Sequence, residues 1–479
     1  MRVLSNDSGN SAIPVRHWTL AWLGVAALIV FLFDPGIMSN DSFASLQQAR
    51  TFEFTDWHPP IMALVWSVLD RIIPGPAGML ICQALLYAYG CSRLCRYAFP
   101  NLVRRFPSWL IVAVFSLFPP VMTLAGMIWK DIWMSGFLLL ALAQLFRLQS
   151  LPKGRSGYRH VVQIVLLCLA ATAFRHNAIA ATAGLLAAAV FWLLQGRKWL
   201  PRFLLASIAG CLVSVILYLC TSFANSLIAR PAELTTAIYL HDIAGTVVYS
   251  GDKEAAARMV LDAPTPVTDN PQQFLVRLQN AYSPAAATHL LRTSKRTKTP
   301  FSIDIFALDH DAHGVQEIRK ALIRAYPAAY FKHRTMTFAC LLQMCDRQQW
   351  IFHSYVMNER YALPATLDNQ SLQYTLRRLF LSEHLAVLYH PGLWLLVTLV
   401  GGALGLLQLP HNRRNLLLFM GLSSAGLSLS LYFTSPIESY RYMHWTVLLG
   451  WTVLFLALDA MASHRARNAT PEASGDVAS

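Results

Sequence analysis

Long apolar segments are the feature that most constrains how this chain can fold. Most of them approach the roughly 20 residues that a helix needs to cross a bilayer. Only 13% of the 479 residues are charged, about half the share of about 25% that soluble proteins carry. The chain is therefore expected to be an all-α polytopic membrane protein with about ten transmembrane helices. The expected spans are 17–33, 76–97, 107–126, 131–148, 160–174, 178–195, 201–220, 388–409, 413–433 and 441–461.

Basic residues predict how these spans are oriented. They cluster before the first span, in every second short loop, and after the last span, which is the positive-inside pattern of cytoplasmic segments. Both termini are thus expected in the cytoplasm of a bacterium, with the chain in the inner (plasma) membrane. The net charge of +14 then reflects topology, and no nucleic-acid partner is expected. The residues concerned are Arg2, Arg16, Arg93, Arg96, Arg104, Arg105, Lys153, Arg155, Arg159, Arg197, Lys198, Arg202, Arg413, Arg414, Arg465 and Arg467.

The loops between these clusters face outward, and two of them are long. The first, 34–75, contains an apolar stretch at 59–73 that is short and interrupted by charge, and we expect a helix lying in the membrane interface. The second defines a mostly helical outer domain. The predicted organisation is an N-terminal transmembrane module at 1–220, the outer domain at 221–387, C-terminal transmembrane helices at 388–463, and a disordered cytoplasmic tail at 464–479.

The first outer loop carries polar residue types suited to chemistry. It reads Ser-Asn-Asp-Ser around Asp41, and Asp56-Trp57-His58-Pro59-Pro60 further on. Asp41 also suits the N-cap of a following helix, where Asp is favoured. Asp56 suits a cap of the helix that the prolines begin. From residue types alone, a structural and a functional role remain open for both acids.

These motifs, taken in order, resemble those of the GT-C glycosyltransferases. The resemblance is to the dolichyl-phosphate-mannose protein mannosyltransferase type and its bacterial relatives. Its parts are an acid soon after the first span, the His-Pro-Pro that begins at His58, and short polar motifs at the outer ends of later spans. The family pattern has two adjacent acids, Asp-Glu, where this chain has Asp41-Ser42. The later motifs are Ile128-Trp129-Lys130-Asp131, Phe174-Arg175-His176-Asn177 and Ser439-Tyr440-Arg441-Tyr442.

The resemblance implies roles for these residues. Asp41 would be the catalytic base that takes the proton of the acceptor, with its pKa raised by partial burial near lipid. The cations would bind the phosphate of the donor, where negative charge grows in the transition state. The expected substrate-binding residues are Asp56, His58, Lys130, Asp131, Arg175, Arg441 and Tyr442.

Each of these residues also has a structural interpretation. Lys130 and Arg175 can extend toward lipid headgroups. Asp131 can pair with Lys130 or cap its helix, and Arg441 can pair with Glu438 three residues before it. Because the residues share one side of the membrane, the functional interpretation is favoured for the set.

Metal and disulfide chemistry leave weaker signals. The segment 309–313 reads Asp-His-Asp-Ala-His, which has ligand types at close spacing but also the composition of a polar turn. We expect no metal and no cofactor. Cys340 and Cys345 lie in the outer domain, where a disulfide is feasible, but their spacing alone does not decide it.

The sequence therefore predicts an inverting glycosyltransferase in the membrane. The donor would be a polyprenyl-phosphate-linked sugar that enters from the membrane lipids, and the acceptor a cell-envelope glycan, lipid or protein. Two alternatives are a polysaccharide polymerase or ligase that uses a diphosphate-linked glycan, and a transporter or flippase of lipid-linked substrates. Transporters commonly carry broken helices in matching halves and charges near mid-membrane, whereas here the charges lie at helix ends.

Overall fold

The structure is a computed structural model, and it is almost entirely helical. It describes residues 15–232, 234–261, 271–287, 290, 312–345, 370–380, 382–408 and 411–468. The one sheet in these residues has two short parallel strands, β1 (Phe54–Thr55) and β2 (Ala229–Arg230). The predicted all-α class is confirmed.

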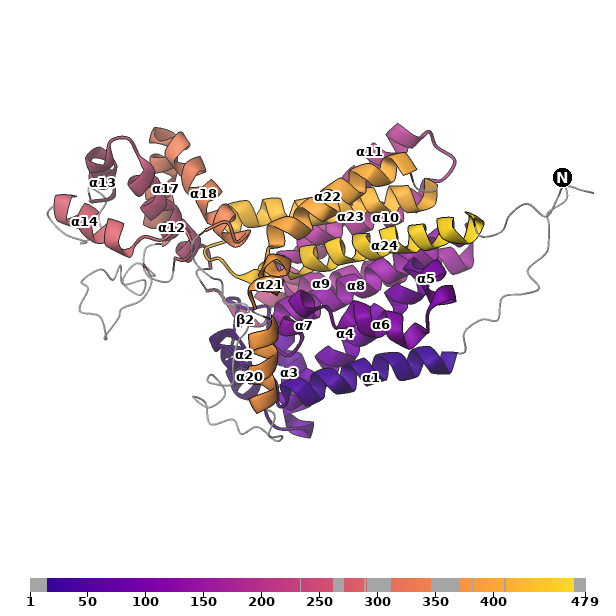
Figure 1. Ribbon diagram of the computed structural model, residues 1–479. Helices are drawn as coiled ribbons and strands as arrows, with labels where there is room; N and C mark the ends of the chain where they lie inside the picture. Colours follow the sequence, from indigo (N-terminus) through magenta and orange to yellow (C-terminus); the bar gives the residue numbers. More distant parts are fainter. Residues whose placement is uncertain are drawn as a thin grey trace, which may run out of the picture.

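Long helices run side by side as one bundle (Figure 1). A helix or a broken helix lies at each of the ten predicted spans. Six of the described helices are long and apolar enough to cross a membrane, or up to eight if each of two bent pairs is one span. The chain is thus a multi-pass membrane protein. The bundle contains α1 (Val15–Phe33), α4 (Ala77–Ala98), α5 (Pro100–Arg105), α6 (Ser108–Ser116), α7 (Pro119–Ala125), α8 (Lys130–Gln149), α9 (Arg155–Phe174), α10 (Ala178–Leu193), α11 (Trp199–Ser226), α22 (Pro391–Gln408), α23 (His411–Thr434) and α24 (His444–Asn468).

Two bends interrupt the apolar segments. The predicted span 107–126 is a broken pair, because α6 and α7 meet at 76°. Pro119 and Pro120 begin α7, and proline lacks the N–H that would continue the helix before it. The second bend separates α3 (Pro60–Ile72) from α4 by 117°. A helix is found at the predicted stretch 59–73, and its expected place in the membrane interface stays a prediction.

Close approach of backbones holds several bundle helices together. A Cβ at Gly210 on α11 would lie 2.5 Å from the Ala187 nitrogen of α10. A Cβ at Gly184 on α10 would lie 2.6 Å from the Phe419 carbonyl oxygen of α23. Small residues at helix crossings are typical of membrane bundles, where van der Waals contact replaces the hydrophobic effect.

The first outer loop begins with α2 (Asn40–Thr51). Its N-cap is Ser39, which forms a capping box with Ser42. Asp41 therefore lies in the first turn and is not the cap that its residue type allowed. Its carboxylate is free to face the rest of the bundle.

The outer helices form a separate cluster with its own core. Phe274, Leu278 and Leu322 are among the buried residues of that core. Two cysteines at its edge, Cys340 and Cys345, form a disulfide, which their spacing had left open. The cluster contains α12 (Leu234–Tyr249), α13 (Lys253–Leu261), α14 (Pro271–Ala281), α17 (Ala312–Ala325) and α18 (Pro327–Leu341).

Segments outside this cluster differ from the predicted boundaries. α20 (Gln370–Phe380) belongs to the segment 221–387 but contacts α1 of the bundle. It is followed by α21 (Glu383–Ala386) and the short helix η1 (Val387–Tyr389). α24 continues through Asn468, beyond the boundary predicted at 463. Asp309, His310 and Asp311 of the polar motif lie outside the described residues.

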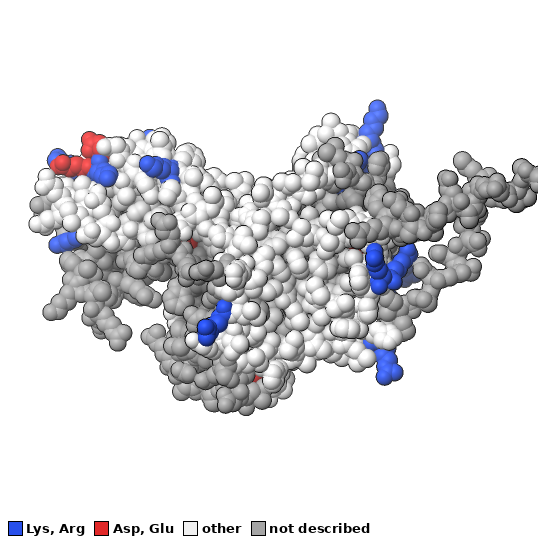
Figure 2. Space-filling model, in the orientation of Figure 1, with Lys and Arg blue, Asp and Glu red and all other residues white. Residues whose placement is uncertain are grey.

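Charged side chains mark the two ends of the bundle. On the face drawn in Figure 2, Lys and Arg appear at the end away from the outer helices and also on the outer helices themselves, and the middle of the bundle shows none. The start of α1, α5 and the end of α24 lie at that basic end, while α2 and α3 lie at the other (Figure 1). An uncharged middle between two polar ends is the surface that a bilayer requires.

Candidate functional site

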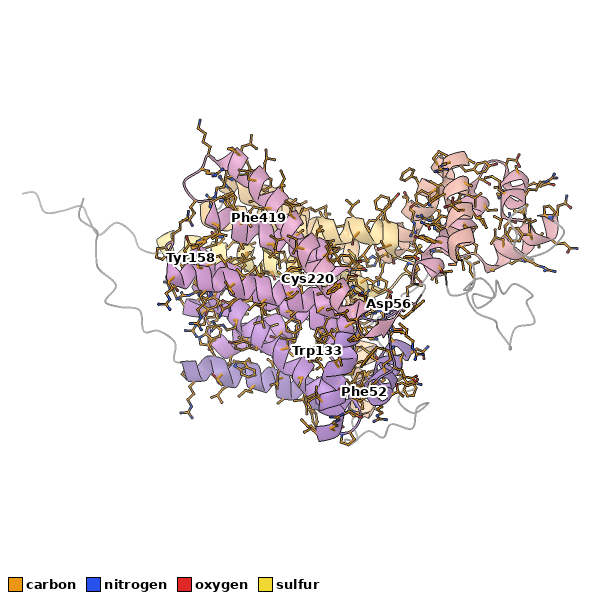
Figure 3. The ribbon with its side chains drawn as sticks, turned by 180° about the vertical axis from the view of Figure 1, so that it is seen from behind. Phe52, Asp56, Trp133, Tyr158, Cys220 and Phe419 are labelled. Carbon is orange, nitrogen blue, oxygen red and sulfur yellow. A yellow bond between two sulfur atoms is a disulfide. The ribbon has the colours of Figure 1, made fainter. Side chains whose placement is uncertain are left out.

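Polar residues from five separate segments meet where α2 and α3 close the bundle. Asp41 comes from α2, His58 precedes α3, and Lys130 and Asp131 begin α8. Arg175 follows α9, and Arg441 lies in the short helix η2 (Tyr440–Met443) before α24. In the view from behind, Asp56 of the same loop lies at this end of the bundle and Tyr158 at the opposite end (Figure 3).

The central contact of this site is an ion pair between residues 400 positions apart. Arg441 Nη2 donates to Asp41 Oδ2 at 2.7 Å. The Arg441 side chain is nearly enclosed at 10% exposure, whereas 34% of the Asp41 side chain remains exposed. Asp41 is thus the acid of the site that an incoming molecule can reach. The pairing of Arg441 with Glu438, which its spacing allowed, is not the ion pair that forms.

Aromatic rings surround the Arg441 guanidinium. Its central carbon lies 4.6 Å from the centre of the Trp129 ring and 5.3 Å from that of Tyr442. Trp129 Nε1 donates to Ser39 Oγ at 2.7 Å, so the indole also contacts the cap of α2. Cation–π contact favours a guanidinium that has lost water. Trp129 lay within a predicted motif but was not predicted as a site residue.

A second carboxylate lies deeper in the same cluster. Asp131 is fully buried, and its Oδ1 lies 2.8 Å from Arg175 Nε. Its Oδ2 lies 3.9 Å from Arg441 Nε. The Arg175 guanidinium is also 4.7 Å from the Tyr442 ring centre. Asp131 therefore pairs with arginines from two other segments, and Arg175 is held in an ion pair instead of simply extending toward lipid headgroups.

His58 connects Lys130 to Asp41. Lys130 Nζ donates to His58 Nδ1, which leaves the ring proton on Nε2 when the imidazole is neutral. Nε2 faces Asp41 Oδ1 at 3.9 Å. Burial is the largest cause that lowers the pKa of His58, to about 3, and the charge of Lys130 adds to it. His58 is therefore a neutral group that orients Lys130 and faces the open carboxylate.

Asp41 is ionised for an electrostatic reason. Burial raises the pKa of its carboxyl, but the charge of Arg441, followed by further contributions that include Lys130, outweighs it. The net pKa lies well below the ordinary value of 3.8. The sequence-based expectation that proximity to lipid raises this pKa is therefore wrong, because the neighbouring cations stabilise the charged form.

A small cavity opens beside these groups. Polar atoms near it are incompletely hydrogen-bonded in the described structure: Arg441 Nε forms no hydrogen bond, and the Asp131 oxygens face Arg175 and Arg441 only as ion-pair partners. Buried polar groups in proteins are nearly always satisfied by protein, water or ligand. Such atoms indicate a place for a polar ligand or ordered water. The cavity is lined by Asp41, Ser42, Ser45, His58, Met62, Ile128, Trp129, Lys130 and Arg441.

One side-chain and one backbone hydrogen bond hold the start of the first outer loop against the segment before α8. Ser42 Oγ donates to the Ile128 carbonyl oxygen at 2.7 Å, and the Ile128 amide donates to the Ile37 carbonyl at 3.0 Å. Ser42 is a short polar residue directly after Asp41. In this chain that position anchors the loop.

Asp56, another predicted site residue, is hydrogen-bonded to the segment after α11 and not to the cluster around Asp41. Asp56 Oδ1 accepts a hydrogen bond from the Ala232 amide, and the Asp56 amide donates to the Arg230 carbonyl at 3.0 Å. Asp56 thus joins the first outer loop to the segment after α11. It does not cap α3, whose N-cap is Pro59.

Metal-ligand types gather at one other place in the described structure. Cys340, Cys345 and Glu438 have ligand atoms within 4.8 Å of one another. The two cysteines form a disulfide, so in that state they offer no thiolate to a metal.

Comparisons with known proteins give structural neighbours only. No protein-family profile matches the chain, and no curated protein matches its sequence. The structure is similar to crystal structures of ArnT from Cupriavidus metallidurans. The form bound to undecaprenyl phosphate is 16% identical with a TM-score of 0.34, covering 96% of this chain and 82% of that one. The apo form is 14% identical with a TM-score of 0.33, covering 94% and 78%. At these values the likeness assigns neither family nor function.

Proposed function

We propose that this chain is an integral-membrane glycosyltransferase that transfers a sugar from a polyprenyl-phosphate donor to an extracytoplasmic acceptor. The observation that carries the proposal is the partly open Asp41 carboxylate, held by Arg441 in a cluster of cations at one end of the bundle. The acceptor would be a glycan, lipid or protein of the cell envelope.

The charge of the site favours an anionic ligand. Lys130, Arg175 and Arg441 outnumber the carboxylates of Asp41 and Asp131, while His58 is neutral. Three basic groups face two acidic groups in a partly enclosed place, so the site carries an excess of positive charge when Lys130 is protonated. Arginine binds phosphate oxygens through two donors at once. A lipid-linked phosphate would reach these groups from the bilayer without leaving headgroup depth.

In the proposed reaction Asp41 acts as the base. The acceptor hydroxyl oxygen forms a bond to the anomeric carbon of the sugar while the bond from that carbon to the phosphate oxygen breaks. The hydroxyl proton passes to Asp41, and the electron pair of the broken bond remains on the polyprenyl phosphate. One displacement of this kind inverts the anomeric configuration. The cations would stabilise the charge that grows on the leaving phosphate.

Donor binding would also convert Asp41 into a stronger base. Arg441 lowers the pKa of Asp41, and a carboxylate of low pKa accepts a proton poorly. A donor phosphate would share Arg441 and place negative charge nearby, and both effects raise the pKa of a carboxyl. Base strength would therefore depend on the donor being present.

The transporter alternative has less support. Both bends among the apolar helix pairs, α3–α4 and α6–α7, fall within residues 60–125 of the described chain. Repeat-based transporters would place such breaks in two matching halves. The paired charges also lie at one end of the bundle instead of near its middle.

The test is sugar transfer by the purified protein in detergent from a panel of labelled polyprenyl-phosphate sugars. We expect Asp41→Asn to lower the rate by roughly 10² to 10⁴-fold, the usual contribution of a positioned base. The matched control is Asp70→Asn, which makes the same change in an ion pair with Arg50 between α2 and α3. Failure of the folded wild-type protein to use any donor, or equal rates for Asp41→Asn and wild type, would contradict the proposal.

A further inference from the structure

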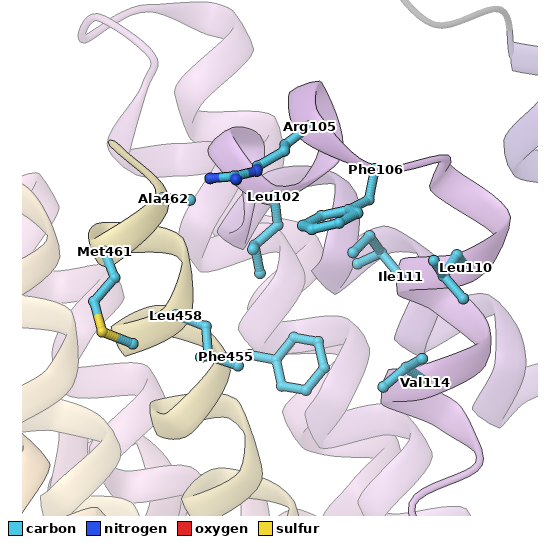
Figure 4. A pocket seen from close by; sticks show the side chains of 10 residues that line it. All are labelled: Leu102, Arg105, Phe106, Leu110, Ile111, Val114, Phe455, Leu458, Met461 and Ala462. Atoms are coloured by element: carbon cyan, nitrogen blue, oxygen red, sulfur yellow. The ribbon is translucent and has the colours of Figure 1, made fainter. Parts of the chain in front are cut away.

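A large apolar cavity lies at the end of the bundle away from Asp41. It has a volume of about 470 Å³, within the roughly 300–1,000 Å³ of small-molecule sites. α5 and α6 form one wall and α24 the other. Figure 4 shows Phe455 and Val114 toward one end of the cavity and Arg105 at the other, its guanidinium extended over the cavity toward Ala462.

The cavity is open on the side that faces lipid. Four of the residues that line it are large hydrophobics with substantial exposure: Phe106 at 42%, Val114 at 50%, Leu458 at 45% and Met461 at 55%. In a bundle whose middle is uncharged, such side chains face acyl chains. The shape and the lining therefore suit the tail of a lipid.

The rim of the cavity suits a phosphate. Arg104 and Arg105 are exposed at the end of α5, and neither forms an ion pair with a carboxylate among the described residues. The nearby acid, Asp459 of α24, is fully buried and accepts hydrogen bonds from the Asn101 and Leu102 amides at 2.7 and 2.9 Å. Its carboxylate is hydrogen-bonded to the start of α5 and, in the described structure, forms no ion pair with either arginine.

We propose that this cavity binds an anionic phospholipid, with its phosphate at Arg105 and an acyl chain along Leu110, Val114 and Leu458. The argument rests on charge complementarity at the rim and apolar lining below it, and it is independent of the transferase reaction. Basic pockets between transmembrane helices on the cytoplasmic side are the usual sites for acidic headgroups. The basic end of the bundle is the end that the positive-inside pattern assigns to the cytoplasm.

The experiment is native mass spectrometry of the full-length protein released from mixed micelles that contain equal amounts of phosphatidylglycerol and phosphatidylcholine. We expect wild type to retain phosphatidylglycerol in preference to phosphatidylcholine. Arg105→Gln should lower phosphatidylglycerol retention about five- to tenfold, as expected for loss of a charge-assisted contact. Leu458→Trp, which fills the cavity, should lower retention of both lipids.

The control is Arg155→Gln, which removes another exposed arginine at the basic end of the bundle, outside the cavity. It should bind lipid as wild type does. Arg105 and Arg155 both lack carboxylate partners in the described structure, so neither change should disturb folding, and melting curves in detergent would check this. Equal retention of the two lipids by wild type, or equal losses in Arg105→Gln and Arg155→Gln, would overturn the proposal.

Discussion

At the scale of single residues, the state of Asp41 depends on Arg441. The two charged groups contact at 2.7 Å, and Arg441 is also held between Trp129 and Tyr442. The rings leave the guanidinium few alternative positions, so its charge stays beside the carboxylate. Arg441 therefore both orients Asp41 and keeps it ionised before a donor arrives.

This dependence predicts how activity responds to pH. Because the pKa of Asp41 lies below its ordinary value, the carboxylate of the free protein loses its charge only as the pH falls below about 4. The ion pair likewise contributes stability above that pH and loses it as the pH falls further. In Arg441→Gln, removal of the cation should raise the pKa of Asp41 by roughly one to three units. The acid limb of kcat/KM should move up in pH by the same amount.

The matched change for this prediction is Arg50→Gln, which removes an arginine from the exposed pair with Asp70 in the same loop. Its acid limb should coincide with that of wild type. An acid limb that stays in place in Arg441→Gln would mean that Arg441 does not set the ionisation of Asp41.

At the scale of elements, the segment 435–440 connects the outer helices to Arg441. Arg334 of α18 donates from Nη1 to the Ser435 carbonyl at 3.0 Å. The Ala287 amide donates to the Pro436 carbonyl at 2.9 Å, and the Glu438 amide to the Ala285 carbonyl at 2.7 Å. Arg441 follows directly, so its position depends on the outer cluster.

Asp242 of α12 fixes Arg334 from the other side. It is fully buried, lies 2.6 Å from Arg334 Nε, and accepts a hydrogen bond from Arg319 Nε at 2.6 Å. His333 Nε2 lies 3.3 Å from the same carboxylate. Burial raises the pKa of Asp242, but His333 and the two arginines outweigh it, so the group stays ionised. The pair Asp242–Arg334 thus joins α12, α18 and the segment before Arg441.

Two substitutions around Asp242 should separate stability from positioning. Arg334→Met and Arg319→Met each remove one arginine from Asp242, and each should lower the free energy of unfolding by roughly 3 kcal/mol. Arg334→Met also removes the contact to Ser435, so it should lower the transfer rate a further tenfold to a hundredfold through misplacement of Arg441. Thermal melting and transfer assays on the same preparations measure both effects.

Arg319→Met is the control in this pair, because Arg319 contacts Asp242 without reaching the segment 435–440. Equal transfer rates for the two variants would show that the link through Arg334 has no part in positioning Arg441.

At the scale of the whole molecule, the two ends of the bundle carry different groups of polar residues. The site with Asp41 and the outer helices lie at one end, and the start of α1, α5 and the end of α24 lie at the other (Figure 1). On the face drawn in Figure 2, Lys and Arg also appear at this second end. The arrangement places the proposed chemistry and the proposed phospholipid site at opposite surfaces of the membrane.

The positive-inside pattern predicts which surface is which. A green fluorescent protein fused after Asn468 should fluoresce in cells, because that end of α24 is expected in the cytoplasm. An alkaline phosphatase fused after Ser250, at the end of α12, should be active because it is exported. The reverse pair of results would place the Asp41 site in the cytoplasm and exclude an extracytoplasmic acceptor.

Local features of the sequence predicted much of the architecture. The length of each apolar run predicted where helices lie, because crossing a bilayer requires a fixed number of apolar residues. Alternation of basic loops predicted which helix ends lie together. His58-Pro59-Pro60 predicted the start of α3, since proline suits the first turn of a helix. The predicted span 107–126 ran across the break at Pro119 and Pro120.

Only the tertiary structure decided how the polar residues pair. Asp41 has polar neighbours close in sequence, yet its ion pair is with Arg441, 400 positions away. Asp131 is next to Lys130 in the sequence but forms its ion pair with Arg175. Lys130 is hydrogen-bonded to His58. The direction of the Asp41 pKa shift follows from these partners, so it could not be predicted from residue type. The length of an apolar segment and the charge of a loop are local properties, so the sequence alone predicts the helices and their orientation. Ion pairing and burial depend on which distant segments pack together, so only the tertiary structure shows them.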